Sequence, residues 1–121
     1  MSKFGKVMKE IRKPLGESLR AMAKRLDISP AFLSALEVGK KTIPYSYASK
    51  IAKEYELDLE TERKIEVAIL ETNGYFRIDL TKLNKLEKEV ALLFARKVKD
   101  LTKKQIKELS ELLGDEKHES I

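Results

Sequence analysis

Residues 18–44 read SLRAMAKRLDISPAFLSALEVGKKTIP, and this stretch decides the fold. Apolar residues recur at helical spacing over Leu19–Leu26 and again over Pro30–Val38. Between the two segments, Ser29 is a suitable N-cap, and the proline after it occupies the first helical position, where its missing N–H costs nothing. Gly39 follows the second segment as a helix stop. The stretch therefore predicts two short helices joined by a tight turn.

The apolar residues of these two helices are expected to pack against each other. The small Ala23 stands where the helices approach most closely. Asp27 occupies the turn, where Asp tolerates a left-handed backbone better than most residues do. The expected contact set is Met22, Ala23, Leu26, Ile28, Leu33 and Leu36.

Turn signals divide the rest of the chain into further helices. Pro14 and Gly16 end a first helix, Pro44 opens a fourth, and Asn73-Gly74 closes a fifth. The pair Thr102 and Gln105 forms a capping box before the last helix, which Gly114 ends. The expected helices cover residues 3–13, 17–26, 30–38, 45–55, 59–73, 83–101 and 103–113.

Residues 75–80 are different, because the apolar residues Phe76, Ile78 and Leu80 alternate with Arg77 and Asp79, which is typical of a strand. This segment either pairs with the same segment of a second copy or is a packed extended linker. We therefore expect an all-α chain, with a five-helix domain at 1–74 and a two-helix extension at 75–121. We expect 115–121 to be disordered.

Charge is distributed unevenly along the chain. Residues 1–53 carry 12 Lys or Arg against 4 Asp or Glu, a net charge of +8. Residues 54–75 carry 2 against 7, a net charge of −5, and residues 76–121 carry 11 against 9, a net charge of +2. A basic N-terminal half is what a polyanion partner requires, although a solvated lysine-rich surface gives the same count.

Composition excludes several classes of function. The chain has no cysteine, so disulfides, cysteine zinc sites and thiol catalysis are excluded. Its one histidine, His118, lies in the polar tail, and no phosphate-binding glycine loop or matched pair of carboxylates is present. No apolar run reaches the length of a membrane span, and the N-terminus is not a signal peptide. We expect a soluble, cytoplasmic protein that is not an enzyme and holds no cofactor or metal.

Residues 18–44 resemble the lambda-repressor-like (Cro/repressor, XRE) family of helix-turn-helix regulators. The stretch is similar to the family run of Leu-Ala, Leu-Gly-Val-Ser, Ile-Ser and Glu-x-Gly-Lys, ending in Pro. The resemblance covers roughly residues 4–70 and leaves 76–121 outside it. Two residues depart from the family pattern: Leu19 stands where a phosphate-contacting Gln is usual, and Asp27 stands where the turn glycine is usual.

The resemblance implies that the third helix enters the major groove of duplex DNA. The positions that match base-facing residues are Pro30, Ala31, Phe32, Ser34 and Ala35. None of them can make a bidentate contact with a base, so readout would use thymine methyls and DNA shape, unless this face packs on protein instead. The positions expected to bind phosphate are Lys40, Lys41, Thr42, Arg20 and Lys24, with Lys13 and Lys50 as further candidates. The family also pairs residues at the positions of Arg12 and Glu37, which is a structural ion pair.

The extension at 75–121 is expected to mediate assembly. Its first helix carries an apolar stripe that needs cover, formed by Leu86, Val90, Leu93 and Phe94. The helices either fold back on the first domain or hold a homodimer on a palindromic operator. The expected function is sequence-specific DNA-binding transcriptional regulation, as a repressor from a phage, a mobile element or a toxin–antitoxin operon. An antitoxin that holds a toxin through this extension, and a protein-interaction module without DNA binding, are the alternatives.

Overall fold

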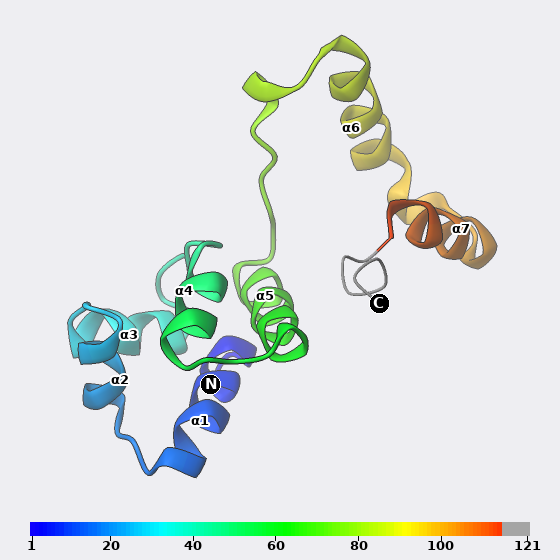
Figure 1. The fold of residues 1–121 in the computed structure, drawn as a ribbon. Helices are drawn as coiled ribbons and strands as arrows, with labels where there is room; N and C mark the ends of the chain where they lie inside the picture. The colour runs from blue at the N-terminus through cyan, green and yellow to red at the C-terminus, as the bar shows by residue number, and fades with distance from the viewer. Residues whose placement is uncertain (115–121) are drawn as a thin grey trace. The chain divides into compact units, whose positions relative to one another are not determined.

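The computed structural model describes residues 1–114. The disorder expected at 115–121 and the histidine at position 118 lie outside the described residues. The described chain is all-helical, which confirms the predicted fold class (Figure 1). No helix within residues 1–114 is long and apolar enough to cross a membrane.

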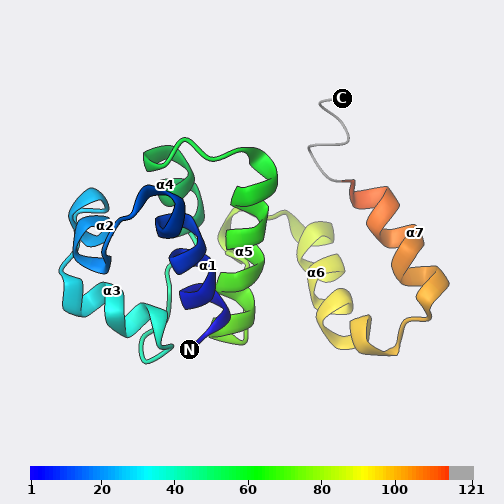
Figure 2. The ribbon, with the colours of Figure 1, turned by 90° about the horizontal axis from the view of Figure 1, so that it is seen from below.

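The chain divides into two compact units, with the boundary between Phe76 and Arg77. The first unit holds five α-helices and one 3₁₀ turn. In it, the longest helix packs against the first and the fourth, and the second packs against the third (Figures 1 and 2). These elements are α1 (Lys3–Arg12), η1 (Lys13–Leu15), α2 (Leu19–Arg25), α3 (Pro30–Glu37), α4 (Tyr47–Glu54) and α5 (Leu59–Asn73).

One apolar core lies within the first unit. All five helices contribute to it, because each carries apolar residues at helical spacing on one side. The loop between α3 and α4 contributes Ile43, which is buried. The largest buried apolar side chains are those of Phe4, Met8, Met22, Leu26, Leu33, Leu36, Ile43, Ile51, Ile65 and Ile69.

The second unit contains η2 (Leu80–Lys82), α6 (Lys85–Lys97), η3 (Val98–Asp100) and α7 (Lys103–Leu113). The predicted helix at 83–101 is shorter in the structure. Asn84 and Glu87 form a capping box that begins α6 at Lys85, and the chain tightens into a 3₁₀ turn after Lys97. Thr102 and Gln105 form the predicted capping box of α7.

Residues 75–79 form no regular element in the single chain, and the pairing of this segment with a second copy stays a prediction. A strand exists only when a second strand pairs with it, and no strand occurs anywhere in residues 1–114. The side chains of Phe76, Ile78 and Leu80 all face solvent, so the expectation of a packed linker is wrong.

No residue from 77 to 114 is buried, although this segment is rich in apolar side chains. Those exposed on α6 are Leu86, Val90, Leu92, Leu93 and Phe94. Helices of 13 and 11 residues are marginal in water without tertiary packing. The described part of the second unit, residues 77–114, therefore lacks the apolar burial that a stable domain needs.

Candidate nucleic-acid interface

The turn between α2 and α3 is defined by local hydrogen bonds. Asp27 has a φ of 58°, the left-handed conformation that the sequence suggested for it. Ser29 caps α3, because its Oγ accepts a 3.0 Å hydrogen bond from the backbone N–H of Phe32. Ser18 caps α2 in the same way through the N–H of Ala21. Both helices of the motif thus begin at a serine cap, which sets the direction in which α3 leaves the turn.

One side of α3 packs on the apolar core of the first unit, through the residues predicted to be in contact. Met22, Ala23, Leu26, Leu33 and Leu36 are fully buried, and Ile28 is partly buried against them. The side chains of Phe32 and Leu19 are also partly buried on this core. Leu19, which replaces a polar family residue, therefore has a packing role.

The opposite side of α3 faces away from the core. Of the five residues proposed to face bases, Ala31 and Ser34 are exposed, while Pro30, Phe32 and Ala35 are half-buried. Val38, one helical turn beyond Ser34, is exposed as well. The outward face of α3 is consequently smooth and mainly apolar, with one hydroxyl.

The loop after α3 is held at both ends. At its start, Gly39 has a φ of 83° and the N–H of Lys40 bonds the carbonyl of Ala35 at 2.9 Å, which closes the helix. At its end, the Asn73 side chain accepts from the N–H of Ile43 and donates to its carbonyl, both at 2.9 Å. The loop between these points is therefore fixed, and it exposes Lys40, Lys41 and Thr42.

Cationic side chains flank both ends of α3. Lys40 and Lys41 follow its C-terminus, while Arg20 and Lys24 on α2 line a shallow cavity that also includes Ser29 and Pro30 at its N-terminus. All four cations are exposed, and none forms an ion pair with another residue in 1–114. Asp27 lines the same cavity as Arg20 and Lys24, so one acid lies beside these cations, and the remaining surplus of positive charge around the α3 face suits a polyanion.

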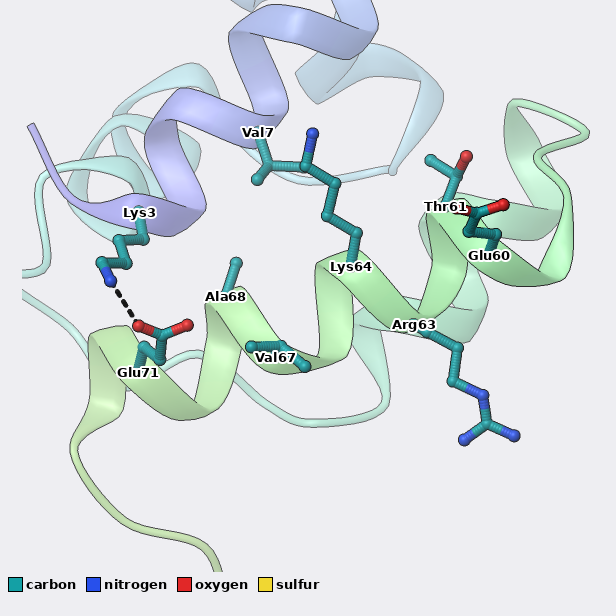
Figure 3. Close-up of a pocket in the computed structure, with 9 residues that line it drawn as sticks. All are labelled: Lys3, Val7, Glu60, Thr61, Arg63, Lys64, Val67, Ala68 and Glu71. Atoms are coloured by element: carbon teal, nitrogen blue, oxygen red, sulfur yellow. Dashed lines mark hydrogen bonds and ion pairs between the residues drawn. The ribbon is translucent and has the colours of Figure 1, made fainter. Parts of the chain in front are cut away.

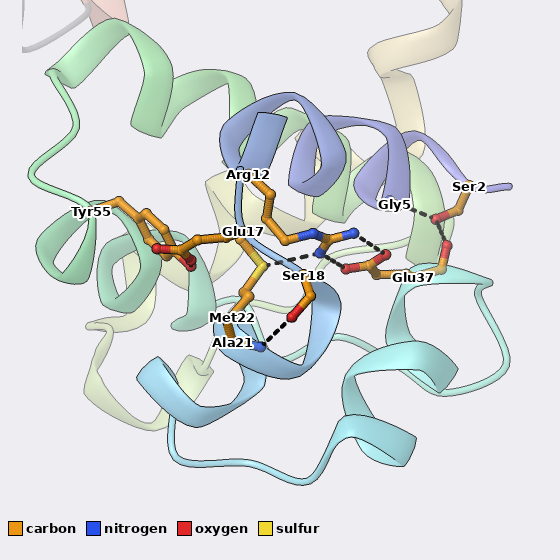
Figure 4. Close-up of polar contacts among 9 residues, drawn as sticks. All are labelled: Ser2, Gly5, Arg12, Glu17, Ser18, Ala21, Met22, Glu37 and Tyr55. Carbon is orange, nitrogen blue, oxygen red and sulfur yellow. Dashed lines mark hydrogen bonds and ion pairs between the residues drawn. The ribbon is translucent and has the colours of Figure 1, made fainter. Parts of the chain in front are cut away.

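A buried ion pair joins α1 to the end of α3 (Figure 4). Arg12 Nη1 lies 2.5 Å from Glu37 Oε2, and Arg12 Nη2 donates to Glu37 Oε1 at 3.4 Å. The two side chains are only 7% and 2% exposed. Arg12 Nη1 also contacts the sulfur of Met22 at 3.3 Å, so the guanidinium bridges α1, α2 and α3.

The start of α1 approaches the end of α3 closely. Ser2 Oγ donates to the carbonyl of Glu37 at 2.6 Å and accepts the N–H of Gly5 at 3.0 Å (Figure 4). A Cβ atom on Gly5 would lie 2.4 Å from that same carbonyl oxygen. Glycine is therefore required inside α1, where the sequence shows only a weak helix former.

A second polar cluster fixes the ends of α2 and α4. Tyr55 donates a 2.8 Å hydrogen bond to Glu17 Oε1, Arg25 pairs with the other oxygen of that carboxylate, and the Arg25 guanidinium lies 4.5 Å from the centre of the Tyr55 ring. The hydrogen bond from Tyr55 lowers the pKa of Glu17. Burial, followed by the Glu17 hydrogen bond, raises the pKa of Tyr55. These residues are far apart in the sequence, and no local motif connects them.

The hollow between α1 and α5 has a different character (Figure 3). Its apolar floor includes Val7, Val67 and Ala68. On its rim, Lys3 pairs with Glu71. Lys64, which also lines the hollow, donates to Glu10 at 3.0 Å. Because the cations there are paired with carboxylates, this face does not suit a polyanion as the α3 face does.

Comparison with known proteins gives a family for the first unit. A helix-turn-helix family model matches residues 8–61, which run from α1 into α5 and include α2, its turn and α3. Searches of curated proteins and of solved structures found no match to this chain. The geometry and the family match agree with the resemblance seen in residues 18–44. Residues 8–61 of this chain are therefore similar to the XRE/lambda-repressor-like helix-turn-helix family, which supports a DNA-binding helix-turn-helix regulator.

Proposed function

We propose that the chain is a sequence-specific transcriptional repressor that binds duplex DNA through α3 as a homodimer. The observation that carries this proposal is the exposed face of α3, flanked at both ends by exposed cations that form no ion pair within residues 1–114. In this fold such a helix lies in the major groove with its N-terminal half at the base edges. Ala31, Ser34 and Ala35 would then face bases, with Pro30 and Phe32 at the rim of the contact.

The cations would supply most of the affinity. Lys40, Lys41 and Thr42 lie on a loop that is anchored at both ends, so contacts with phosphates cost little backbone entropy. Arg20 and Lys24 would contact phosphates near the other end of α3. Each phosphate neutralised by Lys or Arg releases counterions, which makes binding weaken as salt rises.

Replacing Lys40 and Lys41 together with alanine is expected to weaken binding about equally on all duplexes. The slope of log K against log salt should flatten by up to about 2, because each phosphate contact contributes about 1. The measurement is a fluorescence-anisotropy titration at several salt concentrations. The control is the Lys6→Ala/Lys9→Ala variant, which removes the same charge from exposed positions on α1. Equal slopes for wild type and the Lys40/Lys41 variant would show that these lysines do not contact phosphates.

The second unit supports a homodimer because its apolar side chains have no cover within the described chain. Leu86, Val90, Leu93 and Phe94 fall along one side of α6 by helical spacing. Burying one such side chain is worth about 1.5–3 kcal/mol, so several at a symmetric interface offset the entropy of association. A dimer would present two α3 helices to half-sites about one DNA turn apart.

Leu93→Glu is expected to turn the dimer into a monomer, because a carboxylate would enter the apolar interface. Leu92→Glu is the matched control: the two leucines are adjacent and equally exposed, at 50% and 53%, but Leu92 lies on the other side of α6. Sedimentation equilibrium of the full chain gives both dissociation constants. A dimer that survives Leu93→Glu would place assembly elsewhere.

The same exposed apolar surface favours one other function. An antitoxin would use α6 and α7 to hold a toxin protein while the first unit binds the operator. This alternative differs in its partner and keeps the role of α3. It predicts a full chain that stays monomeric until the second protein is added.

A further inference from the structure

One tyrosine contacts side chains from both ends of α2. Tyr55, the residue at which α4 ends, donates its 2.8 Å hydrogen bond to Glu17, which directly precedes the Ser18 cap of α2 (Figure 4). The face of the same ring lies 4.5 Å from the guanidinium of Arg25, the last residue of α2. Glu17 and Arg25 also pair with each other, so the three side chains form a closed group, the Tyr55 triad.

The Tyr55 triad is a polar link between α2 and α4. The α2 helix has seven residues, of which Met22 and Ala23 are buried, and it packs mainly against α3. A helix this short, with little buried surface, has few contacts of its own to fix its tilt. Holding α2 at both ends therefore determines where its exposed side chains lie.

Two of those exposed side chains are the cations proposed to contact phosphate. Arg20 and Lys24 are four residues apart, so they lie on one side of α2, and both line the shallow cavity at the start of α3. Arg25 follows Lys24 directly but lies on a different side of the helix, against Tyr55. The triad thus uses one cation of α2 to hold the helix, while Arg20 and Lys24 remain exposed.

We propose that Tyr55 is a positioning residue for DNA binding: it holds α2 so that Arg20 and Lys24 lie where they can contact the phosphates of a duplex. The proposal rests on the phosphate contacts of the preceding subsection, and it gives Tyr55 itself no contact with DNA. Hydrogen bonds to phosphate need short distances and good alignment, so a small tilt of α2 would weaken both contacts together. Lys40 follows the other end of α3, and its contact would not depend on the triad.

The protonation states of the triad suit this role. The hydrogen bond from Tyr55 lowers the pKa of Glu17. Burial, and then the bond to Glu17, raises the pKa of Tyr55. At neutral pH the phenol therefore keeps the proton that it donates, and the carboxylate keeps the charge that pairs with Arg25.

Tyr55→Phe tests the role in the full chain, because it keeps the ring for Arg25 and removes only the hydrogen bond to Glu17. The probe is the duplex that the full chain selects from a random pool, at low salt, where weakened variants still bind measurably. If about a third to a tenth of the molecules keep α2 in place, the apparent affinity should fall about three- to tenfold. The control is Tyr47→Phe, which removes an α4 hydroxyl that makes no hydrogen bond within residues 1–114 and should bind as wild type does.

Two further backgrounds show whether Tyr55 acts through α2. Tyr55→Phe should weaken binding by the same factor in the wild type and in the Lys40→Ala/Lys41→Ala variant. In the Arg20→Ala/Lys24→Ala variant it should have no further effect, because the contacts that it positions are already absent. A general loss of structure would instead weaken binding alike in all three backgrounds, and circular dichroism checks that each variant is folded.

The outcomes separate this role from the proposed function. A loss that persists in the Arg20→Ala/Lys24→Ala background would overturn the role of Tyr55, and so would wild-type affinity for Tyr55→Phe. In both cases the DNA-binding function would stand. Wild-type protein that binds no duplex would overturn the positioning role and the proposed function together.

Discussion

Replacing Ala31 with glutamate is expected to abolish specific DNA binding while the protein stays folded. Ala31 is exposed on the outward face of α3, so the change removes no core contact. In the proposed complex the new carboxylate would face base edges and lie between two rows of phosphates. Placing like charges together at an interface costs several kcal/mol, so affinity should fall by at least about 100-fold.

The matched control is Val67→Glu, which adds the same charge to an exposed position on α5. Circular dichroism of both variants should match wild type, and binding should be lost in Ala31→Glu alone. If Ala31→Glu binds the same duplex with wild-type affinity, α3 does not lie in the groove. The protein-interaction reading of the smooth α3 face would then be favoured.

Replacing Arg12 with alanine is expected to have the largest effect on stability. In the wild type the Glu37 side chain is only 2% exposed, and the change removes the partner of its buried carboxylate. Removing one member of a buried ion pair costs about 3–5 kcal/mol, because the remaining charge stays desolvated. Urea denaturation of the wild type and the variant measures the free energy of unfolding directly.

Two controls define the cause of this loss. Lys64→Ala breaks the exposed pair with Glu10 and is expected to cost about 0–1 kcal/mol. The double variant Arg12→Met/Glu37→Leu removes both charges and should recover much of the loss from Arg12→Ala. A cost below about 1 kcal/mol for Arg12→Ala would mean that the pair contributes little, despite its burial.

The elements of the first unit could be predicted from the sequence because their signals are local. Ser29, Pro30 and Gly39 act within a few residues of themselves, and they set the ends of α3. The apolar spacing in α2 and α3 likewise requires no knowledge of the rest of the chain. The pairing of Arg12 with Glu37 came instead from the family resemblance, since the two residues are 25 positions apart.

The features that escaped prediction depend on contacts between distant segments. The sequence indicates only that Asn73 belongs to the turn that ends α5. In the structure its side chain also bonds the loop at Ile43, 30 residues away. No turn signal surrounds Gly5. Glycine is required there because a Cβ atom would lie 2.4 Å from the carbonyl oxygen of Glu37. The alternation at 76–80 suggested a strand, but strand formation depends on a partner that one chain does not contain.

The most direct test of sequence reading by α3 is the ratio of the protein's dissociation constants for two DNA duplexes. Full-length protein would be used to select duplexes from a random pool, and its dissociation constants for the selected site and for a shuffled version would be measured at physiological salt. If α3 reads a DNA sequence, the selected site should bind at least about 10³-fold more tightly, and Ala31→Glu should remove this difference. Equal affinity for the selected and shuffled duplexes would contradict the proposal that α3 reads a DNA sequence.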